Sequence, residues 1–219
     1  MLKKLLVISD AHYPICKLSL IRKIISKEKP DNVVLLGDNI ELSMFKEHLL
    51  AYKHFFRDFN RIFPIKKSII MLGDNDCPFA DRKEITKLVE SYSPMNGSGG
   101  KLFFFKIGAI NFFHGNLEKS AAVEKIGYHF VLNANKISYK IAPKILSALI
   151  RFHFNIAKEE YLFMGHLHFL GVIKNNVFCG TLNKEFTPFP DSLGYVTLVH
   201  ENFIPVKSSI KLVHVDKKA

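Results

Sequence analysis

Leu5-Leu-Val-Ile-Ser-Asp-Ala-His12 is a short apolar run that ends at once in polar residues, with Pro14 just beyond. A short apolar run followed by a turn signal is typical of a buried strand that leads into a loop. Two later stretches repeat the arrangement: residues 33–36 precede Gly-Asp-Asn, and residues 68–72 precede Gly-Asp-Asn-Asp. Helical spacing of apolar residues separates the three runs. The first 90 residues therefore predict a β-α-β-α-β-α unit.

The rest of the chain adds a β-rich part that is interrupted by helices. The helices of the first part are expected at about 18–28, 42–62 and 81–90. Further helices are expected at about 118–141 and 143–158. The further strands are expected at 101–107, 110–113, 161–164, 169–174, 177–180, 194–199 and 202–207. An α/β fold follows from this order, and the chain contains no internal repeat.

Five polar clusters each follow directly after a predicted strand. They are Asp10-x-His12, Gly37-Asp38, Gly73-Asp74-Asn75-Asp76, His114-Gly115 and Gly165-His166-x-His168. Open α/β sheets bind ligands at the carboxyl ends of their strands. Carboxylate and imidazole ligands suit Mn, Fe or Zn, and a set this large indicates two ions that share a bridging carboxylate. Any one cluster alone would be an ordinary loop, so their joint occurrence carries the prediction of a metal site.

Composition narrows the class of protein. A chain of 219 residues fits one large domain or one domain with an insertion, and 31 Lys and Arg against 20 Asp and Glu give a net charge of +11, which favours an anionic partner. No apolar run approaches the ~20 residues of a membrane-spanning helix, and the apolar start is shorter than the core of a signal peptide. The three cysteines show no C-x-x-C spacing. We expect a protein of the reducing cytoplasm.

The ordered clusters resemble the calcineurin-like metallophosphoesterases, whose blocks are D-x-H, G-D, G-N-H-D/E, H and G-H-x-H. The resemblance implies a four-layer αββα sandwich as a single domain over 1–219, with a helical cap insertion at 116–160. It implies two divalent metal ions, Mn²⁺ first and Fe, Zn or Ni as alternatives. By position, the first ion is held by Asp10, His12 and His168, the second by Asp74, His114 and His166, and Asp38 bridges them. The family hydrolyses phosphate esters and anhydrides through a metal-bound hydroxide.

The third block departs from the family, because Gly-Asp-Asn-Asp stands where G-N-H-D/E is usual. The resemblance makes Asn75 and Asp76 catalytic and places Asn39 and Asn75 against the substrate. An amide cannot supply a proton as the usual His can, so we expect phosphodiester or pyrophosphate bonds to be cleaved in preference to simple monoesters. The register of this block leaves an alternative open: in a kinked loop, Asn75 would be the ligand and Asp74 would lie behind it.

The cap slot resembles that of the UDP-2,3-diacylglucosamine pyrophosphohydrolases of the family. Its apolar residues either pack the helices onto the fold or form a lipid groove, and its excess of lysines suits an anionic membrane surface. The expected substrate is a small or lipid-linked phosphate ester, with peripheral contact at the inner membrane face as a further option. Two rival functions stay open: a nuclease for single-stranded or damaged nucleic acid, and a non-catalytic scaffold that binds another protein. The oligomeric state is left undetermined.

Overall fold

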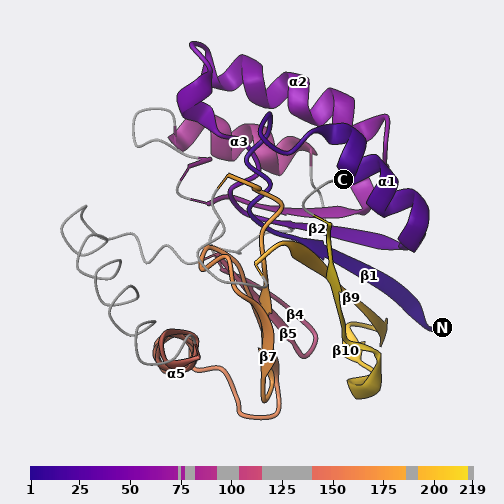
Figure 1. Cartoon of the computed structure of the whole chain (residues 1–219), viewed down its shortest axis with the longest axis vertical. Helices are drawn as coiled ribbons and strands as arrows, with labels where there is room; N and C mark the ends of the chain where they lie inside the picture. The colour runs from indigo at the N-terminus through magenta and orange to yellow at the C-terminus, as the bar shows by residue number, and fades with distance from the viewer. Residues whose placement is uncertain (74, 77–81, 93–103, 115–139, 186–191, 217–219) are drawn as a thin grey trace.

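Two β-sheets stacked face to face form the centre of the molecule (Figure 1). The structure is a computed structural model that describes residues 1–73, 75–76, 82–92, 104–114, 140–185 and 192–216. The first sheet has the order β10-β9-β1-β2-β3, with β11 also paired to β9. Its strands are β1 (Lys3–Ile8), β2 (Asn32–Leu36), β3 (Ser68–Met71), β9 (Gly194–Glu201), β10 (Ile204–Pro205) and β11 (Lys211–His214). β1, β2 and β3 run parallel, whereas β9 is antiparallel to β1.

The second sheet has the order β4-β5-β6-β8-β7. Its strands are β4 (Phe104–Ile107), β5 (Ile110–Phe113), β6 (Tyr161–Met164), β7 (Leu170–Ile173) and β8 (Asn176–Cys179). β5, β6 and β8 are parallel, and antiparallel partners flank them. The inner faces of the two sheets meet in one apolar cluster, in which Val7 and Val34 share a core with Phe112 and Phe163. All four side chains are fully buried, because the strands are covered on both faces.

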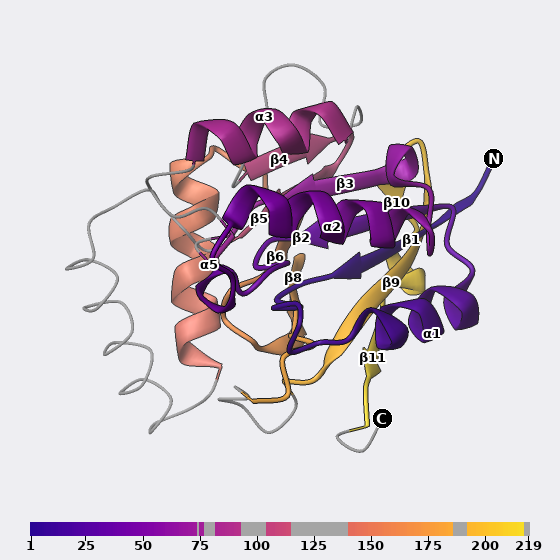
Figure 2. The same ribbon diagram turned by 90° about the horizontal axis from the view of Figure 1, so that it is seen from above.

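Helices cover the outer faces, as Figure 2 shows from above. They are α1 (Leu18–Glu28), α2 (His48–Asn60), α3 (Arg82–Tyr92) and α5 (Ile141–His153), with 3-10 turns at Leu42–Met44, Ile65–Lys67 and Lys207–Ser209. α1, α2 and α3 pack on the first sheet, where Phe55, Phe56 and Phe59 are buried from one side of α2. Each such buried side chain contributes about 1.5–3 kcal/mol. α5 packs on the second sheet through Ile150. The four-layer αββα sandwich is confirmed.

Within the described residues the predicted order of strands and helices is confirmed, but several boundaries differ. Residues 42–62 do not form one helix, because Phe45 adopts an extended backbone and stacks on Tyr13 at 6.3 Å between ring centroids. Its apolar character therefore serves packing of a loop. The helix expected to reach residue 158 ends at His153, since Asn155 has a left-handed φ of 50°. The helix expected at 118–141 lies mostly outside the described residues.

The C-terminal strand expected at 202–207 is also shorter than predicted. Asn202 and Phe203 both have positive φ, so the turn extends to Phe203 and β10 keeps only two residues. A strand that was not predicted, β11, follows and pairs with β9 at the edge of the first sheet. Its side chains are only partly buried, which explains why no apolar run marks it. Among the described residues, no helix has the length and apolar character required to cross a bilayer.

Candidate metal centre

The loops after β1 and β2 lie side by side and continue the pairing of the two strands. Asp10 N–H donates to the carbonyl of Gly37 at 3.1 Å, and His12 N–H donates to the carbonyl of Asp38 at 2.8 Å. Tyr13 N–H then donates to Asn39 at 2.9 Å. These bonds continue the parallel ladder beyond the strand ends. The first two polar clusters of the sequence are thereby held at one edge of the sheet.

The backbone of the polar clusters is held in an unusual conformation. Five of the predicted ligands have left-handed φ values of 47–66°: Asp10, His12, Asp38, His166 and His168. A non-glycine residue in this region costs about 1–3 kcal/mol and persists only where its surroundings enforce it. Here the carbonyl of Asp10 accepts hydrogen bonds from Thr181 Oγ1 at 2.8 Å and Leu182 N–H at 3.2 Å. The loop after β8 therefore braces the loop after β1.

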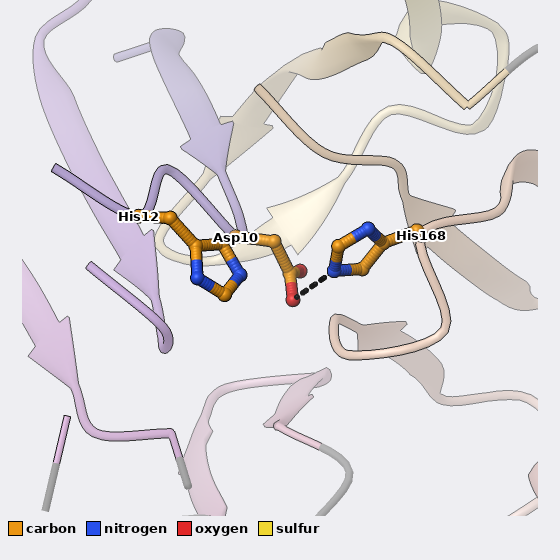
Figure 3. A group of neighbouring side chains, drawn as sticks. All are labelled: Asp10, His12 and His168. Atoms are coloured by element: carbon orange, nitrogen blue, oxygen red, sulfur yellow. Dashed lines mark ion pairs between the residues drawn. The ribbon is translucent and has the colours of Figure 1, made fainter. Parts of the chain in front are cut away.

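The first group of side chains consists of Asp10, His12 and His168, whose ligand atoms all lie within 4.8 Å of one another. Figure 3 shows the Asp10 carboxylate between the two imidazole rings, and His168 Nε2 lies 3.2 Å from Asp10 Oδ1. All three side chains are buried. Burial raises the pKa of Asp10, but the positive potential of His168 and His114 outweighs it and lowers this pKa below its ordinary value. Asp10 is thus held as a carboxylate.

The second group consists of Asp38, His114 and His166, again with ligand atoms within 4.8 Å of one another. His114 Nε2 lies 3.4 Å from Asp38 Oδ1. The other oxygen of the same carboxylate, Oδ2, lies 3.7 Å from His12 Nε2 of the first group. Asp38 thus lies between the two groups, with one oxygen toward each. This is the placement that a bridging ligand requires.

The donor set fits divalent metal ions. His12 Nε2 is buried and makes no hydrogen bond, although its ring points at the carboxylate of Asp38. A buried polar atom without a partner is costly, and a metal ion would satisfy it. Carboxylate oxygens and imidazole nitrogens are the donors that Mn, Fe and Zn accept. We therefore assign the two groups as a candidate dinuclear centre.

Two glycines of the polar clusters leave room for the second group. A Cβ on Gly37 would lie 2.3 Å from His114 Cγ, and φ at this position is +75°. A Cβ on Gly73 would lie 2.0 Å from Asp38 Oδ1. Both distances are far below the van der Waals contact distance. Gly37 and Gly73 are therefore required at these positions, because any side chain there would displace a ligand of the second group.

The cluster Gly73-Asp74-Asn75-Asp76 contacts the second group through Asn75, and the sequence had left open whether Asp74 or Asn75 would do so. Asp74, predicted as a ligand, lies outside the described residues. Asn75 donates to Asp38 twice, from its backbone N–H to Oδ1 at 3.0 Å and from Nδ2 to Oδ2 at 2.9 Å. Its half-buried side chain therefore lies at the candidate bridging carboxylate. The position suits a residue that contacts metal or substrate, and the role predicted for Asn75 remains a prediction.

Asp76 and Asn39, predicted to act in catalysis and substrate binding, are buried behind the two groups. Asp76 accepts hydrogen bonds from Gly73 N–H at 3.0 Å, Ile40 N–H at 2.8 Å and Asn39 Nδ2 at 2.9 Å. Asn39 Nδ2 also donates to Met71 O at 2.7 Å. Burial and the nearby Asp38 raise the pKa of Asp76 to about 6. Asp76 and Asn39 therefore join the loop after β2 to the loop after β3 by hydrogen bonds. Their predicted roles in catalysis and in substrate binding remain predictions.

Sequence reasoning missed two residues that support the ligands, Glu41 and Thr181. Glu41 Oε2 lies 2.9 Å from His12 Nδ1, and Thr181 bonds the Asp10 backbone as described above. A signal for Glu41 exists, since an acidic residue three positions after Asp38 lies in a loop already singled out. Thr181 lies just after the end of β8 and next to Gly180, but nothing in the sequence distinguishes it from an ordinary turn residue.

Comparisons with known proteins bear on the fold. No family model and no curated protein matches the chain. The solved structure of TT1561 from Thermus thermophilus is similar with a TM-score of 0.55 at 13% identity, covering 99% of this chain and 100% of that one. A metallophosphoesterase from Sphaerobacter thermophilus gives 0.48 at 12% identity, covering 99% and 89%, and an archaeal phosphodiesterase gives 0.47 at 12%, covering 97% and 99%.

The chain has the same fold as TT1561, with two stacked sheets and helices on their outer faces. Such low identities concern the fold alone. The resemblance of the motifs to the metallophosphoesterases, and of the cap to their UDP-diacylglucosamine branch, stays a prediction, and residues 116–139 of the cap lie outside the described part. The described remainder of the predicted cap, α5, packs on the second sheet.

Proposed function

We propose that this protein is a dinuclear metal-dependent hydrolase that cleaves phosphodiester or pyrophosphate bonds. The observation that carries the proposal is the position of Asp38, with one carboxylate oxygen facing His12 and the other facing His114. Two divalent ions bound there would polarise a phosphate ester and lower the pKa of a water molecule. We propose Mn²⁺ as the first choice of metal, with Fe, Zn or Ni as alternatives.

Asn75 supports the choice of bond. Its side-chain amide lies at Asp38, so a phosphate bound at the centre would come within reach of the amide N–H. An amide donates a hydrogen bond and thereby stabilises charge on a phosphate oxygen, but it cannot protonate a leaving alkoxide. A general acid is typically worth about 10²–10⁴ in rate. Substrates whose leaving group needs no proton are therefore favoured, namely pyrophosphates and activated diesters.

The lipid-linked part of the proposal draws support from α5. Leu149 and Phe152 are 56% and 89% exposed on the side of this helix that faces away from the sheet. Lys140 and Lys144 are exposed at the start of this helix, and the helix has no acidic residue. The guanidinium of Arg151 is instead hydrogen-bonded to Asn176 and to backbone carbonyls. An apolar stripe with cationic neighbours is the composition of a surface that contacts anionic lipid. We propose peripheral contact of a cytoplasmic enzyme with such a membrane.

One experiment tests the activity. The purified protein is analysed for metal, stripped with a chelator and reloaded with Mn²⁺. Hydrolysis is then measured on an aryl phosphodiester, a nucleotide-sugar pyrophosphate, single-stranded DNA and an aryl phosphomonoester. We expect the diester or the pyrophosphate to rank first, with the stripped protein inactive. If single-stranded DNA ranks first, the nuclease replaces this proposal. If no metal binds and no substrate is cleaved, the non-catalytic scaffold does so.

A further inference from the structure

His12 is contacted from behind by an acidic side chain. Glu41 Oε2 lies 2.9 Å from His12 Nδ1, on the side of the ring opposite to the nitrogen that faces Asp38. The other oxygen of this carboxylate, Oε1, accepts a hydrogen bond from Ser43 Oγ at 2.5 Å. The Glu41 side chain is 19% exposed, whereas that of His12 is 6% exposed. The contact therefore forms at the edge of the buried centre.

Backbone bonds place the two side chains opposite each other. Glu41 N–H donates to the carbonyl of Tyr13 at 2.9 Å, and Tyr13 N–H donates to the carbonyl of Asn39. Tyr13 also forms a bridge with Ile40. Residues 12–13 and 38–41 are thus paired as a short continuation of the parallel ladder. The Glu41–His12 contact is built into this pairing and does not depend on a freely rotating surface side chain.

We infer that Glu41 is a positioning residue for the first metal group. Its carboxylate accepts the Nδ1 proton of His12, which fixes the neutral tautomer whose Nε2 lone pair points toward Asp38. A ring nitrogen bound to a carboxylate also makes the opposite nitrogen a stronger metal donor. The inference rests on the proposed function, because it assigns the residue to the metal centre proposed above.

The second group offers an internal reference. His114 Nδ1 lies 2.6 Å from the backbone carbonyl of Leu36. A carbonyl is a weaker acceptor than a carboxylate, since it carries no net charge. The two groups therefore hold equivalent imidazoles with different partners. Removal of the Glu41 carboxylate is expected to affect the first group and to leave the second unchanged.

The tautomer of His12 is measured first, on metal-free protein with ¹⁵N-labelled histidine, at a basic pH at which the nitrogen shifts show a neutral ring. Long-range proton–nitrogen correlation spectra should show the wild-type His12 protonated on Nδ1. In Glu41→Ala the ring should shift toward protonation on Nε2. In Glu41→Gln the amide oxygen still accepts the proton, so the wild-type tautomer should persist. An unchanged tautomer in Glu41→Ala overturns the inference.

Mn²⁺ binding is measured next by calorimetry on the stripped protein. Loss of a partner that orients a metal ligand typically costs 10–100-fold in affinity. We expect Glu41→Ala to weaken one of two Mn²⁺ sites by about this factor and Glu41→Gln to weaken it less. Glu47→Ala is the matched control, because Glu47 lies six residues away and makes no capping hydrogen bond to α2. It should bind as the wild type does.

The outcomes separate this inference from the proposed function. If the wild type binds no Mn²⁺, Fe²⁺, Zn²⁺ or Ni²⁺, both fail. If the wild type binds two ions and Glu41→Ala binds them with wild-type affinities, only the role of Glu41 fails. An equal loss at both sites together with a lower melting temperature would show a merely structural role, and would also overturn the inference.

Discussion

The two ligand groups contain the same kinds of side chain, one aspartate and two histidines each, yet they are supported differently. In the first group all three side chains are buried, and Thr181 and Glu41 contact the ligands from behind. In the second group His166 is only half-buried, and His114 is held by a backbone carbonyl. The two groups therefore offer the same donor types but differ in the contacts that hold their side chains in place.

For the proposed dinuclear centre, this difference predicts two metal sites of unequal affinity. A ligand group fixed by several hydrogen bonds loses little conformational freedom on binding an ion, so its affinity should be higher. The second group shares its aspartate with Asn75 and lies at the more open side. We expect the first group to retain its ion and the second to exchange it more readily.

The largest effect is expected where the two groups meet, at Asp38. Asp38→Ala removes the carboxylate whose two oxygens face the two groups. Losing several kcal/mol of charge stabilisation corresponds to a fall in kcat/KM of about 10³-fold or more. Metal content should also fall below two ions per chain. Asp58→Ala is the control, because Asp58 forms only exposed ion pairs with arginines. Retained activity in Asp38→Ala would refute a shared carboxylate.

A matched pair of variants separates the two groups. His12→Ala and His114→Ala each remove one imidazole, and both should lose most activity because the proposed mechanism uses both ions. They should differ in the affinity of the ion that remains. His114→Ala keeps the firmly supported first group, so its remaining Mn²⁺ should bind about 10-fold tighter than that of His12→Ala. Calorimetry on both stripped proteins measures this ratio, and an inverted ratio would show that the support described above does not govern affinity.

Variants of Asn75 test how the side chain next to the second group affects the choice of substrate. Asn75→His restores a side chain that can supply a proton near Asp38, so hydrolysis of an alkyl phosphomonoester should rise by up to about 10²-fold. The rate on an activated aryl diester should change little, because its leaving group needs no proton. Asn75→Ala is the control, and it should slow both reactions. A monoesterase rate that stays at the wild-type level would mean that the missing acid does not limit this reaction.

Much of the fold and most of the candidate ligands could be predicted from the sequence, because the signals lie in short contiguous stretches. Apolar runs such as residues 5–8 followed by Asp10-x-His12 identify a strand and its ligands together, because the signal is contiguous. The sharing of Asp38 followed from the family resemblance, and the distances agree with it. The order of strands and helices predicted an α/β fold, and the four layers were implied by the family resemblance.

The contacts that support the ligands were not predicted. Thr181 contacts Asp10 across 171 positions of sequence, and Glu41 contacts His12 across 29. The Thr181 contact depends on how the two sheets stack, whereas the Glu41 contact depends on how the loops after β1 and β2 pair, and no periodicity encodes either. β11 was missed for a related reason: it pairs at a sheet edge with partly exposed side chains. The helix predicted at 42–62 was too long because Phe45 fits the helical spacing of apolar residues although it packs in a loop. Spacing alone does not distinguish the two cases.

The smallest effect is expected at Thr181, behind the first group. Thr181→Val keeps the shape of the side chain and removes the hydroxyl that donates to the carbonyl of Asp10 and accepts from Asn183 N–H; the Asp10 carbonyl retains Leu182 N–H as a partner. Each hydrogen bond is worth about 1 kcal/mol, so the free energy of unfolding of the metal-free protein should fall by about 2 kcal/mol. Mn²⁺ affinity should fall at the first group alone.

Ser209→Ala is the matched control for this variant. Ser209 Oγ accepts from Val199 N–H at 2.8 Å and joins a loop to β9, on a part of the first sheet that supplies no member of either ligand group. Urea unfolding should show a similar loss of stability, while calorimetry should show two Mn²⁺ sites of wild-type affinity. If Thr181→Val loses stability without any change in Mn²⁺ binding, the left-handed backbone of Asp10 is held by the rest of the fold. The difference between the two groups would then reside in Glu41 and in burial.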